Sequence, residues 1–221
     1  MTVADCHLCG QIAGDPRRDL IAQLLPGAPY VRRVVVDSES FAVIPSLGPL
    51  ADGHLLVCPR HHLRRFADTP AEMHAEYAEL RRHIITALRD TYGRAVHVFE
   101  HGMACAHGGA LCTVDHAHVH FVPLPDHVAA LDPGDGDWRE FDGRLDTLAA
   151  LTGGRAYISY EPPGGTPRLA VDAGTRFESQ YMRRLIASAT GGADWNWRAR
   201  PDAASTHRTW RQCTAAMAAV P

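Results

Sequence analysis

The stretch that most constrains this chain is residues 116–123, in which three histidines alternate with apolar residues before Pro123. Alternation with a period of two predicts a β-strand, because successive side chains of a strand point to opposite faces of the sheet. We therefore expect His116, His118 and His120 on one face and the intervening apolar residues in the core. Three imidazoles on one strand face are hard to explain by packing, and imidazole readily exchanges protons near pH 7. The run predicts a reaction centre.

A tri-histidine metal site is the alternative interpretation of the same run. Alternate positions on a strand are about 6.5–7 Å apart, so two of them can reach one ion but three cannot without distortion. At least one of the three rings is therefore expected to be free of metal.

Composition narrows the function classes. The net charge of −3 argues against a surface that coats nucleic acid, and the absence of lysine removes every lysine-based mechanism. We see no apolar leader segment and no apolar stretch of membrane-spanning length, so we expect a cytoplasmic protein without a membrane partner. The six cysteines then indicate metal or thiol roles rather than disulfides.

Cys6 and Cys9 stand in a Cys-x-x-Cys pattern, which can wrap one soft divalent ion, with Zn²⁺ as the default. The pair supplies only half of a tetrahedral site, so histidines elsewhere would have to complete it. Reduced structural thiols are the alternative. A thioredoxin-like redox pair is disfavoured because no strand precedes the motif and no βαβ pattern follows it.

Three segments together resemble the histidine triad (HIT) superfamily of nucleotide hydrolases and transferases: the histidine run, the Cys-x-x-Cys segment 6–14, and the segment 53–62. The resemblance covers residues 5–126, as in a longer bacterial member with a C-terminal extension. It implies an α+β fold with an antiparallel sheet of about five strands and one packed helix. We expect a catalytic domain at 1–130, an extension at 131–221 packed on it, and a homodimer.

Periodicity and turn residues predict the individual elements. A helix over 69–91 is expected to begin at an N-cap Thr69, with Glu72 completing a capping box. The other predicted elements are strands at 30–37, 41–45, 54–58, 95–99, 155–160 and 167–171, and helices at 137–152, 179–190 and 206–219. Trp195 and Trp197 near the end either stack a base or pin the C-terminal arm to the body.

The resemblance also implies site residues. It implies that His62 and His116 join Cys6 and Cys9 around a structural Zn²⁺ and leave His118 free for chemistry. It implies substrate contacts from Ser46, Leu47, Glu100, His101, Gly109, Cys112 and Thr113. Three of these depart from the family pattern: Ser46 replaces an Asp that holds ribose, Glu100 replaces an amide, and Cys112 replaces a Gln.

The resemblance further implies that His118 attacks the α-phosphorus of a nucleotide and that His120 bonds or protonates phosphate or leaving-group oxygens. A third histidine, rather than Gln, favours hydrolysis of a nucleoside phosphoramidate, a dinucleoside polyphosphate or a related compound. Two alternatives stay open. One is a nucleotidyltransferase, with chemistry like that of galactose-1-phosphate uridylyltransferase, or a nucleotide-releasing enzyme of specialised metabolism. The other is a non-catalytic nucleotide-binding module.

Overall fold

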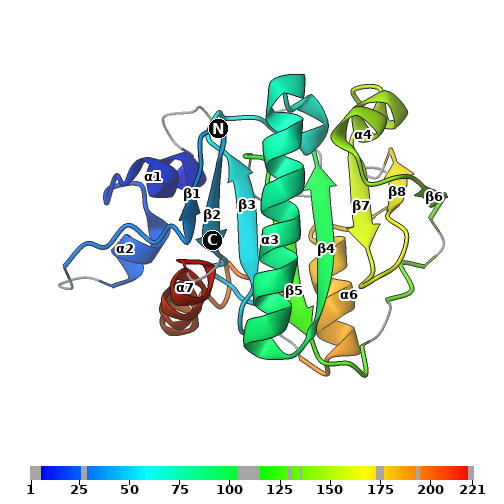
Figure 1. Cartoon of the computed structure of the whole chain (residues 1–221). Coiled ribbons are helices and arrows are strands. Elements are labelled where there is room, and N and C mark those ends of the chain that lie inside the picture. Colours follow the sequence, from blue (N-terminus) through cyan, green and yellow to red (C-terminus); the bar gives the residue numbers. More distant parts are fainter. Residues whose placement is uncertain are drawn as a thin grey trace.

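The computed structural model describes residues 6–25, 29–103, 115–128, 131–134, 136–172, 177–192 and 195–218. One antiparallel sheet runs through them in the order β1-β2-β3-β5-β4-β7-β8-β6 (Figure 1). The strands are β1 Val36–Asp37, β2 Phe41–Pro45, β3 Leu55–Pro59, β4 Ala95–Gly102, β5 Val119–Leu124, β6 Arg139–Glu140, β7 Tyr157–Glu161 and β8 Arg168–Val171. The helices are α1 His7–Ala13, α2 Leu20–Leu24, α3 His74–Tyr92, α4 Leu145–Thr152, α6 Tyr181–Ala189 and α7 Ala203–Ala218.

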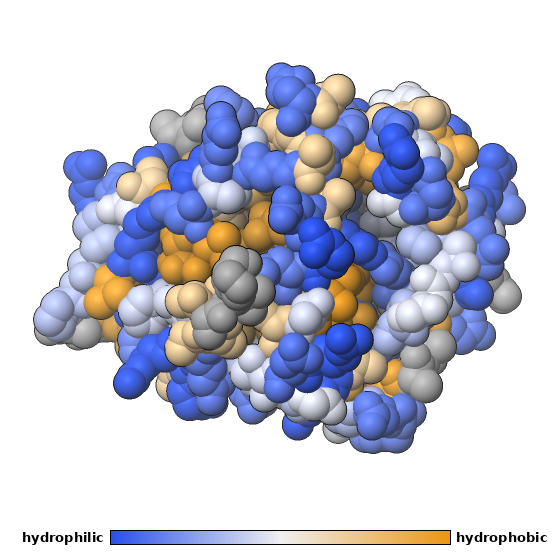
Figure 2. All heavy atoms as spheres, in the orientation of Figure 1, coloured by the Kyte–Doolittle hydropathy of each residue, from blue (hydrophilic) through white to orange (hydrophobic). Residues whose placement is uncertain are grey.

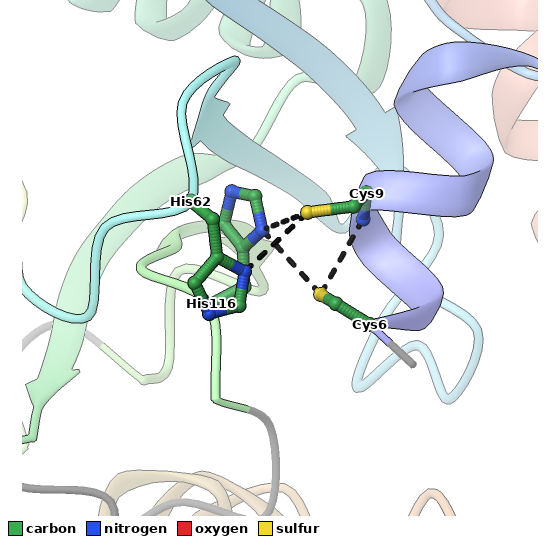
Figure 3. A group of neighbouring side chains, drawn as sticks. All are labelled: Cys6, Cys9, His62 and His116. Atoms are coloured by element: carbon green, nitrogen blue, oxygen red, sulfur yellow. Dashed lines mark hydrogen bonds between the residues drawn. The ribbon is translucent and has the colours of Figure 1, made fainter. Parts of the chain in front are cut away.

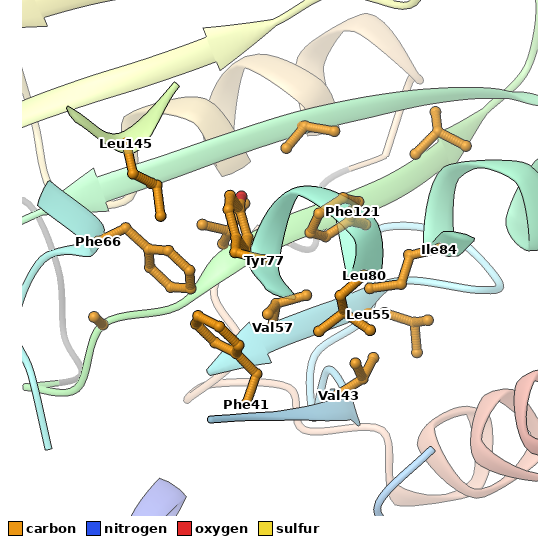
Figure 4. Close-up of a cluster of buried hydrophobic side chains, with 14 of the residues drawn as sticks. Phe41, Val43, Leu55, Val57, Phe66, Tyr77, Leu80, Ile84, Phe121 and Leu145 are labelled. Atoms are coloured by element: carbon orange, nitrogen blue, oxygen red, sulfur yellow. The ribbon is translucent and has the colours of Figure 1, made fainter. Parts of the chain in front are cut away.

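Both faces of the central strands are buried, which explains why β2 and β3 are apolar throughout rather than alternating. One face contributes Phe41, Val43, Leu55 and Val57 to the largest hydrophobic cluster, seen in Figure 4. The residues between them form a second cluster on the other face, which Ile12 of α1 covers. The sheet is thus the middle layer of the molecule.

Helix α3 covers the first of these faces (Figure 1). Its buried residues Tyr77, Leu80, Ile84 and Leu88 follow three- and four-residue steps, as predicted, and this spacing places them in one apolar stripe. Helix α7 packs beside α3 and adds Cys213 and Met217 to the same cluster, with the Tyr92 hydroxyl donating to Gln212. Figure 2 shows that hydrophilic residues cover most of this side of the molecule, with smaller hydrophobic patches between them.

The predicted N-cap of α3 is wrong. The helix begins at His74, after a 3₁₀ turn over Ala71–Met73, and no side chain caps it. Pro70 has an extended backbone (ψ 146°), so Thr69 lies two residues before the first helical turn. The Thr69 hydroxyl is buried without a hydrogen-bond partner among the described residues.

Helices α1 and α6 cover the opposite face of the sheet. Met182 and Ile186 of α6 pack on residues of three strands, Phe99 of β4, Val122 of β5 and Ile158 of β7. The space between α1 and α6 on this face is where the candidate site lies. None of the helices in the described part of the chain is long and apolar enough to cross a membrane.

The α+β class is confirmed, but the sheet has eight strands rather than about five. The extra strands come from beyond residue 130, because β7 pairs with β4 along Val98–Gly102 and carries β8 and β6 with it. The predicted boundary between 1–130 and 131–221 therefore falls inside one continuous sheet. The division of the chain into a catalytic domain and an extension remains a prediction.

The histidine run is only partly a strand. Strand β5 begins at Val119, so His116 and His118 precede it, and the expectation of three same-face positions on one strand is wrong. Pairing with β3 stops at Val57 and Val119, although β3 itself continues to Pro59, which has no backbone N–H to donate. Beyond that point the backbone N–H of Ala117 donates instead to the Leu63 carbonyl at 2.7 Å.

Glu100 ties three elements together inside the core. Its carboxylate accepts a hydrogen bond from the Tyr157 hydroxyl at 2.5 Å and one from the Phe66 backbone N–H at 2.8 Å. Burial outweighs these bonds and raises the pKa of Glu100 to about 7. A carboxyl group in the core is thus close to half ionised at neutral pH.

We expect Glu100 to make stability depend on pH. Its pKa in the folded protein lies above that of an unfolded chain, about 4.3, so the unfolded chain loses this proton first as pH rises. The free energy of unfolding should therefore fall between about pH 4.5 and 7. Relative to wild type, Glu100→Gln should gain about 3 kcal/mol between pH 5 and pH 8, measured by urea unfolding. A constant difference between the two proteins would contradict this assignment.

Gly53 allows the turn before β3, with φ at +84°. A Cβ at this position would overlap the ring of Tyr92, whereas a Cβ at Gly93 (φ +61°) would meet nothing within 4 Å. Gly93→Ala should cost only the left-handed backbone penalty, about 1–2 kcal/mol. Gly53→Ala should lower the free energy of unfolding by more than Gly93→Ala in the same denaturation experiment. Equal losses would show that the Tyr92 ring moves away from the new Cβ without a cost in stability.

Candidate active site

A cavity lies on the face opposite α3, between α1 and the N-terminal turn of α6. His101 of β4, His120 of β5 and His118 just before β5 line it from the sheet. The segment 44–48 closes one side, and Gln180 and Arg183 close another. Neither Asp nor Glu is among the described residues that line it, so its polar wall is built from imidazoles, amides and guanidinium groups.

His118 is held in one orientation by the backbone. Its Nδ1 lies 2.7 Å from the His116 carbonyl, which can only accept, so Nδ1 carries the ring proton. Burial lowers the pKa of His118, because an imidazolium would lose its water. The neutral ring therefore keeps a lone pair on Nε2, as an attacking nucleophile needs.

His120 has the opposite tautomer, which a hydrogen bond from the His54 ring determines. The Leu50 backbone N–H donates to Nδ1 of His54 at 3.1 Å, so this nitrogen must be unprotonated. His54 Nε2 then carries the proton and donates to His120 Nδ1 at 2.9 Å. Burial holds the pKa values of both rings well below the usual range. We assign the remaining proton of His120 to Nε2, which makes this atom a hydrogen-bond donor. Phe99 stacks on the ring at 4.2 Å and fixes its plane.

His101 is the third imidazole of the cavity wall. Its Nε2 accepts a hydrogen bond from the Met182 backbone N–H at 3.2 Å, which links β4 to α6. Burial first, and then the proximity of His118 and Arg183, lowers the pKa of His101 to about 3. His101 is therefore neutral and cannot act as a cationic clamp.

The structure brings together some of the predicted substrate residues and not others. Ser46, Leu47 and His101 line the cavity with His118 and His120. Glu100 does not, because it alternates with His101 along β4 and points to the α3 face, where Tyr157 and Phe66 occupy its carboxylate. This placement argues against the predicted contact between Glu100 and a substrate. Gly109, Cys112 and Thr113 lie outside the described residues.

Reasoning from the sequence missed three residues of the site. His54 stands in a segment that supported the resemblance, yet nothing in the sequence indicated that it orients His120. Gln180 and Arg183 line the cavity from the C-terminal segment, as does Trp197, for which the sequence had left base stacking open. Arg183 is 3 % exposed and donates to the carbonyls of Gly48 (2.6 Å) and Trp195 (2.8 Å). No local pattern could have placed these residues beside the histidines.

A second polar cluster lies next to the cavity and contains the four predicted metal ligands (Figure 3). Cys6 and Cys9 come from the start of α1, His62 from the turn after β3, and His116 from the entry to β5. One ligand atom from each residue lies within 4.8 Å of all the others. His116 Nε2 lies 2.8 Å from the Pro59 carbonyl, so it carries the proton and Nδ1 faces the thiols with its lone pair.

The donor set and its dimensions fit a tetrahedral ion. The sulfur–nitrogen distances are 3.5 Å for Cys6 and His116, 3.4 Å for Cys9 and His62, and 3.3 Å for Cys9 and His116. Usual zinc–sulfur and zinc–nitrogen bond lengths give tetrahedral edges of about 3.5 Å. Hydrogen bonding with Cys9 lowers the pKa of Cys6 to about 3, which favours its thiolate form. The cluster could therefore hold a metal ion.

Comparison with known proteins finds similarity to one protein family. The model of the HIT domain matches residues 31–127. The adenosine 5′-monophosphoramidase of Saccharomyces cerevisiae is 27% identical over 120 residues, which cover 54% of this chain and 68% of that protein.

Two solved structures are also similar to this chain. A HIT family member from Bacillus subtilis has a TM-score of 0.41 at 23% identity, covering 54% of this chain and 72% of that one. A zinc-bound HIT family protein from Mycobacterium smegmatis has a TM-score of 0.41 at 25% identity, covering 68% of this chain and 91% of that one. The matched region contains the complete histidine run, and residues 31–127 of this chain form a domain of the histidine triad superfamily.

Proposed function

We propose that this protein is a nucleotide hydrolase that cleaves at the α-phosphorus of a nucleoside phosphoramidate, a dinucleoside polyphosphate or a related nucleotidyl compound. The observation that carries the proposal is the state of His118. Its ring is buried at the cavity wall, with Nδ1 committed to the His116 carbonyl and the Nε2 lone pair available. The similar phosphoramidase of Saccharomyces cerevisiae supports a nucleotide substrate.

The proposed reaction has two displacements. In the first, His118 Nε2 forms a bond to the α-phosphorus while the bond from phosphorus to the leaving group breaks, giving a nucleotidyl-histidine. His120 Nε2–H donates a hydrogen bond to the departing group, which takes its proton from solvent, because a neutral imidazole that lost this proton would become an imidazolate. In the second, water attacks the same phosphorus, the nitrogen–phosphorus bond breaks, and a nucleoside monophosphate leaves. The tautomers of the two rings suit these two roles, since His118 Nε2 offers a lone pair and His120 Nε2–H is a hydrogen-bond donor.

We propose that the ion held by Cys6, Cys9, His62 and His116 is Zn²⁺ and that its role is structural. All four protein ligands are present, which leaves no open position for substrate and is typical of structural zinc sites. The four residues come from α1, the β3 turn and the entry to β5, so their joint ligation fixes the segment whose carbonyl orients His118. We also propose a cytoplasmic homodimer as the working form.

Removal of the nucleophile tests the reaction. His118→Ala should lower the rate of monophosphate release from adenosine 5′-phosphoramidate or diadenosine polyphosphates by at least about 10³-fold. Binding of AMP, measured by calorimetry, should stay within a few-fold of wild type. His127→Ala is the matched control, because His127 is exposed outside the cavity, and it should leave both quantities unchanged. Acid quenching of wild type during turnover should give an intact-mass increase of one nucleotidyl group. Unchanged turnover in His118→Ala would refute the proposal.

The zinc site has its own test. Purified protein should contain about one zinc ion per chain, and Cys9→Ala should lose it and melt more than about 5 °C lower. Cys213→Ala also removes a thiol, but one that contacts Tyr92 rather than the cluster, so its zinc content should stay at the wild-type value. Zinc-free wild-type protein with the same melting temperature after chelation would show that the four side chains are reduced structural thiols and imidazoles.

A further inference from the structure

Gln180 is a buried polar residue that lies immediately before α6. It is 5 % exposed and lines the cavity together with His118 and Ser46. Its carboxamide oxygen has no hydrogen-bond partner among the described residues. An unsatisfied buried acceptor costs free energy, and because Gln180 lines the cavity, a donor group on a bound ligand could remove that cost.

The backbone at Gln180 supports the same interpretation. Gln180 has φ at +59°, in the left-handed region, and immediately precedes α6. Only Gln180 and Asp172 have this conformation among the described residues other than glycine. Such strain persists where the surroundings impose it, and ligand sites are among the usual places. Here the hydrogen bond from the Met182 N–H to His101 holds the first turn of α6 against the histidine side of the cavity.

Arg183, one turn further along α6, gives this wall its charge. The guanidinium group bridges Gly48 and Trp195 through its bonds to their carbonyls, so it fixes α6 against the segment 46–48. It is buried at a cavity that no described Asp or Glu lines. The cavity therefore combines a positive charge with an acceptor that lacks a donor, which suits a ligand with an anionic part and a neutral hydroxyl or N–H group.

We propose that Gln180 is a substrate-binding residue whose carboxamide oxygen accepts a hydrogen bond from a sugar hydroxyl or base N–H of the nucleotide, while Arg183 favours its phosphate. This inference rests on the proposed function for the identity of the ligand as a nucleotide. It assigns part of the binding site to the C-terminal segment, beyond the residues that match the HIT domain. The segment after residue 130 then contributes to substrate selection, whereas His118 and His120 of the reaction centre lie before residue 130 in the sequence.

Replacement of the carboxamide by an apolar group of similar size separates binding from structure. Gln180→Leu removes the unpartnered acceptor, so the ligand-free protein should melt at the wild-type temperature or higher. Its affinity for the tightest-binding of the four ribonucleoside 5′-monophosphates should fall about 10-fold or more. Gln212→Leu is the matched control, because Gln212 is exposed on α7 and outside the cavity, and its nucleotide affinity should equal that of wild type.

Two further measurements identify the donor and guard against misfolding. Gln180→Asn keeps a carboxamide and tolerates the left-handed backbone, so it should fold and recover part of the affinity. With the 2′-deoxynucleotide, the difference between wild type and Gln180→Leu should vanish if the donor is the 2′-hydroxyl, and it should persist if the donor is another sugar hydroxyl or a base N–H. Either result supports the proposal.

If the folded Gln180→Leu variant binds nucleotide as tightly as wild type, the inference is overturned. If that variant also melts at a lower temperature than wild type, the role of Gln180 is structural. The proposed reaction can fail separately. If wild type binds monophosphates in a manner that depends on Gln180 but hydrolyses nothing, the hydrolase proposal fails and this inference stands. If wild type hydrolyses its substrate and Gln180→Leu has the same KM, the hydrolase proposal stands and this inference fails.

Discussion

The hydrogen bond from His118 to the His116 carbonyl is the interaction on which the site depends. It decides which nitrogen of His118 carries the proton, and therefore which one faces the cavity with a lone pair. The carbonyl belongs to a residue whose own ring is held by Pro59 on one side and lies beside two thiols on the other. The orientation of the His118 ring therefore depends on the cluster of Cys6, Cys9, His62 and His116, none of whose side chains lines the cavity.

The two-sided burial of the sheet explains why the cavity lies where it does. Apolar residues alternate to both faces of β2 and β3, so each face needs a cover. Helix α3 covers one face together with α4 and α7, whereas α1 and α6 share the other and leave a space between them. His101, His118 and His120 line that space, and each is neutral because burial disfavours the charged ring. A row of histidines in the core is tolerated since backbone groups or another ring satisfy at least one nitrogen of each.

The predictions that failed did so where a neighbour from far along the chain intervened. The strand was predicted to include His116 and His118, but its pairing with β3 stops at Val119, and the Pro59 carbonyl accepts from the His116 ring instead. Glu100 was assigned to substrate because of its place in a motif, but alternation along β4 turns it to the other face, where Tyr157 of the C-terminal segment meets it. The sheet was expected to have about five strands, yet the free edge of β4 accepts β7. Local periodicity contains no information on any of these partners.

The sequence by itself determined the chemistry available to this protein: the histidine run, the Cys-x-x-Cys pattern and the apolar periodicity of α3 and the strands. These signals are local, since period two and period 3.6 follow from backbone geometry alone. Only the tertiary structure decided how the chemistry is arranged. It placed His54 behind His120, turned Glu100 away, and brought Gln180 and Arg183 across more than sixty residues of chain to the side of His118. Packing between distant segments sets tautomer, burial and charge, and the order of residues along the chain does not encode these in any local pattern.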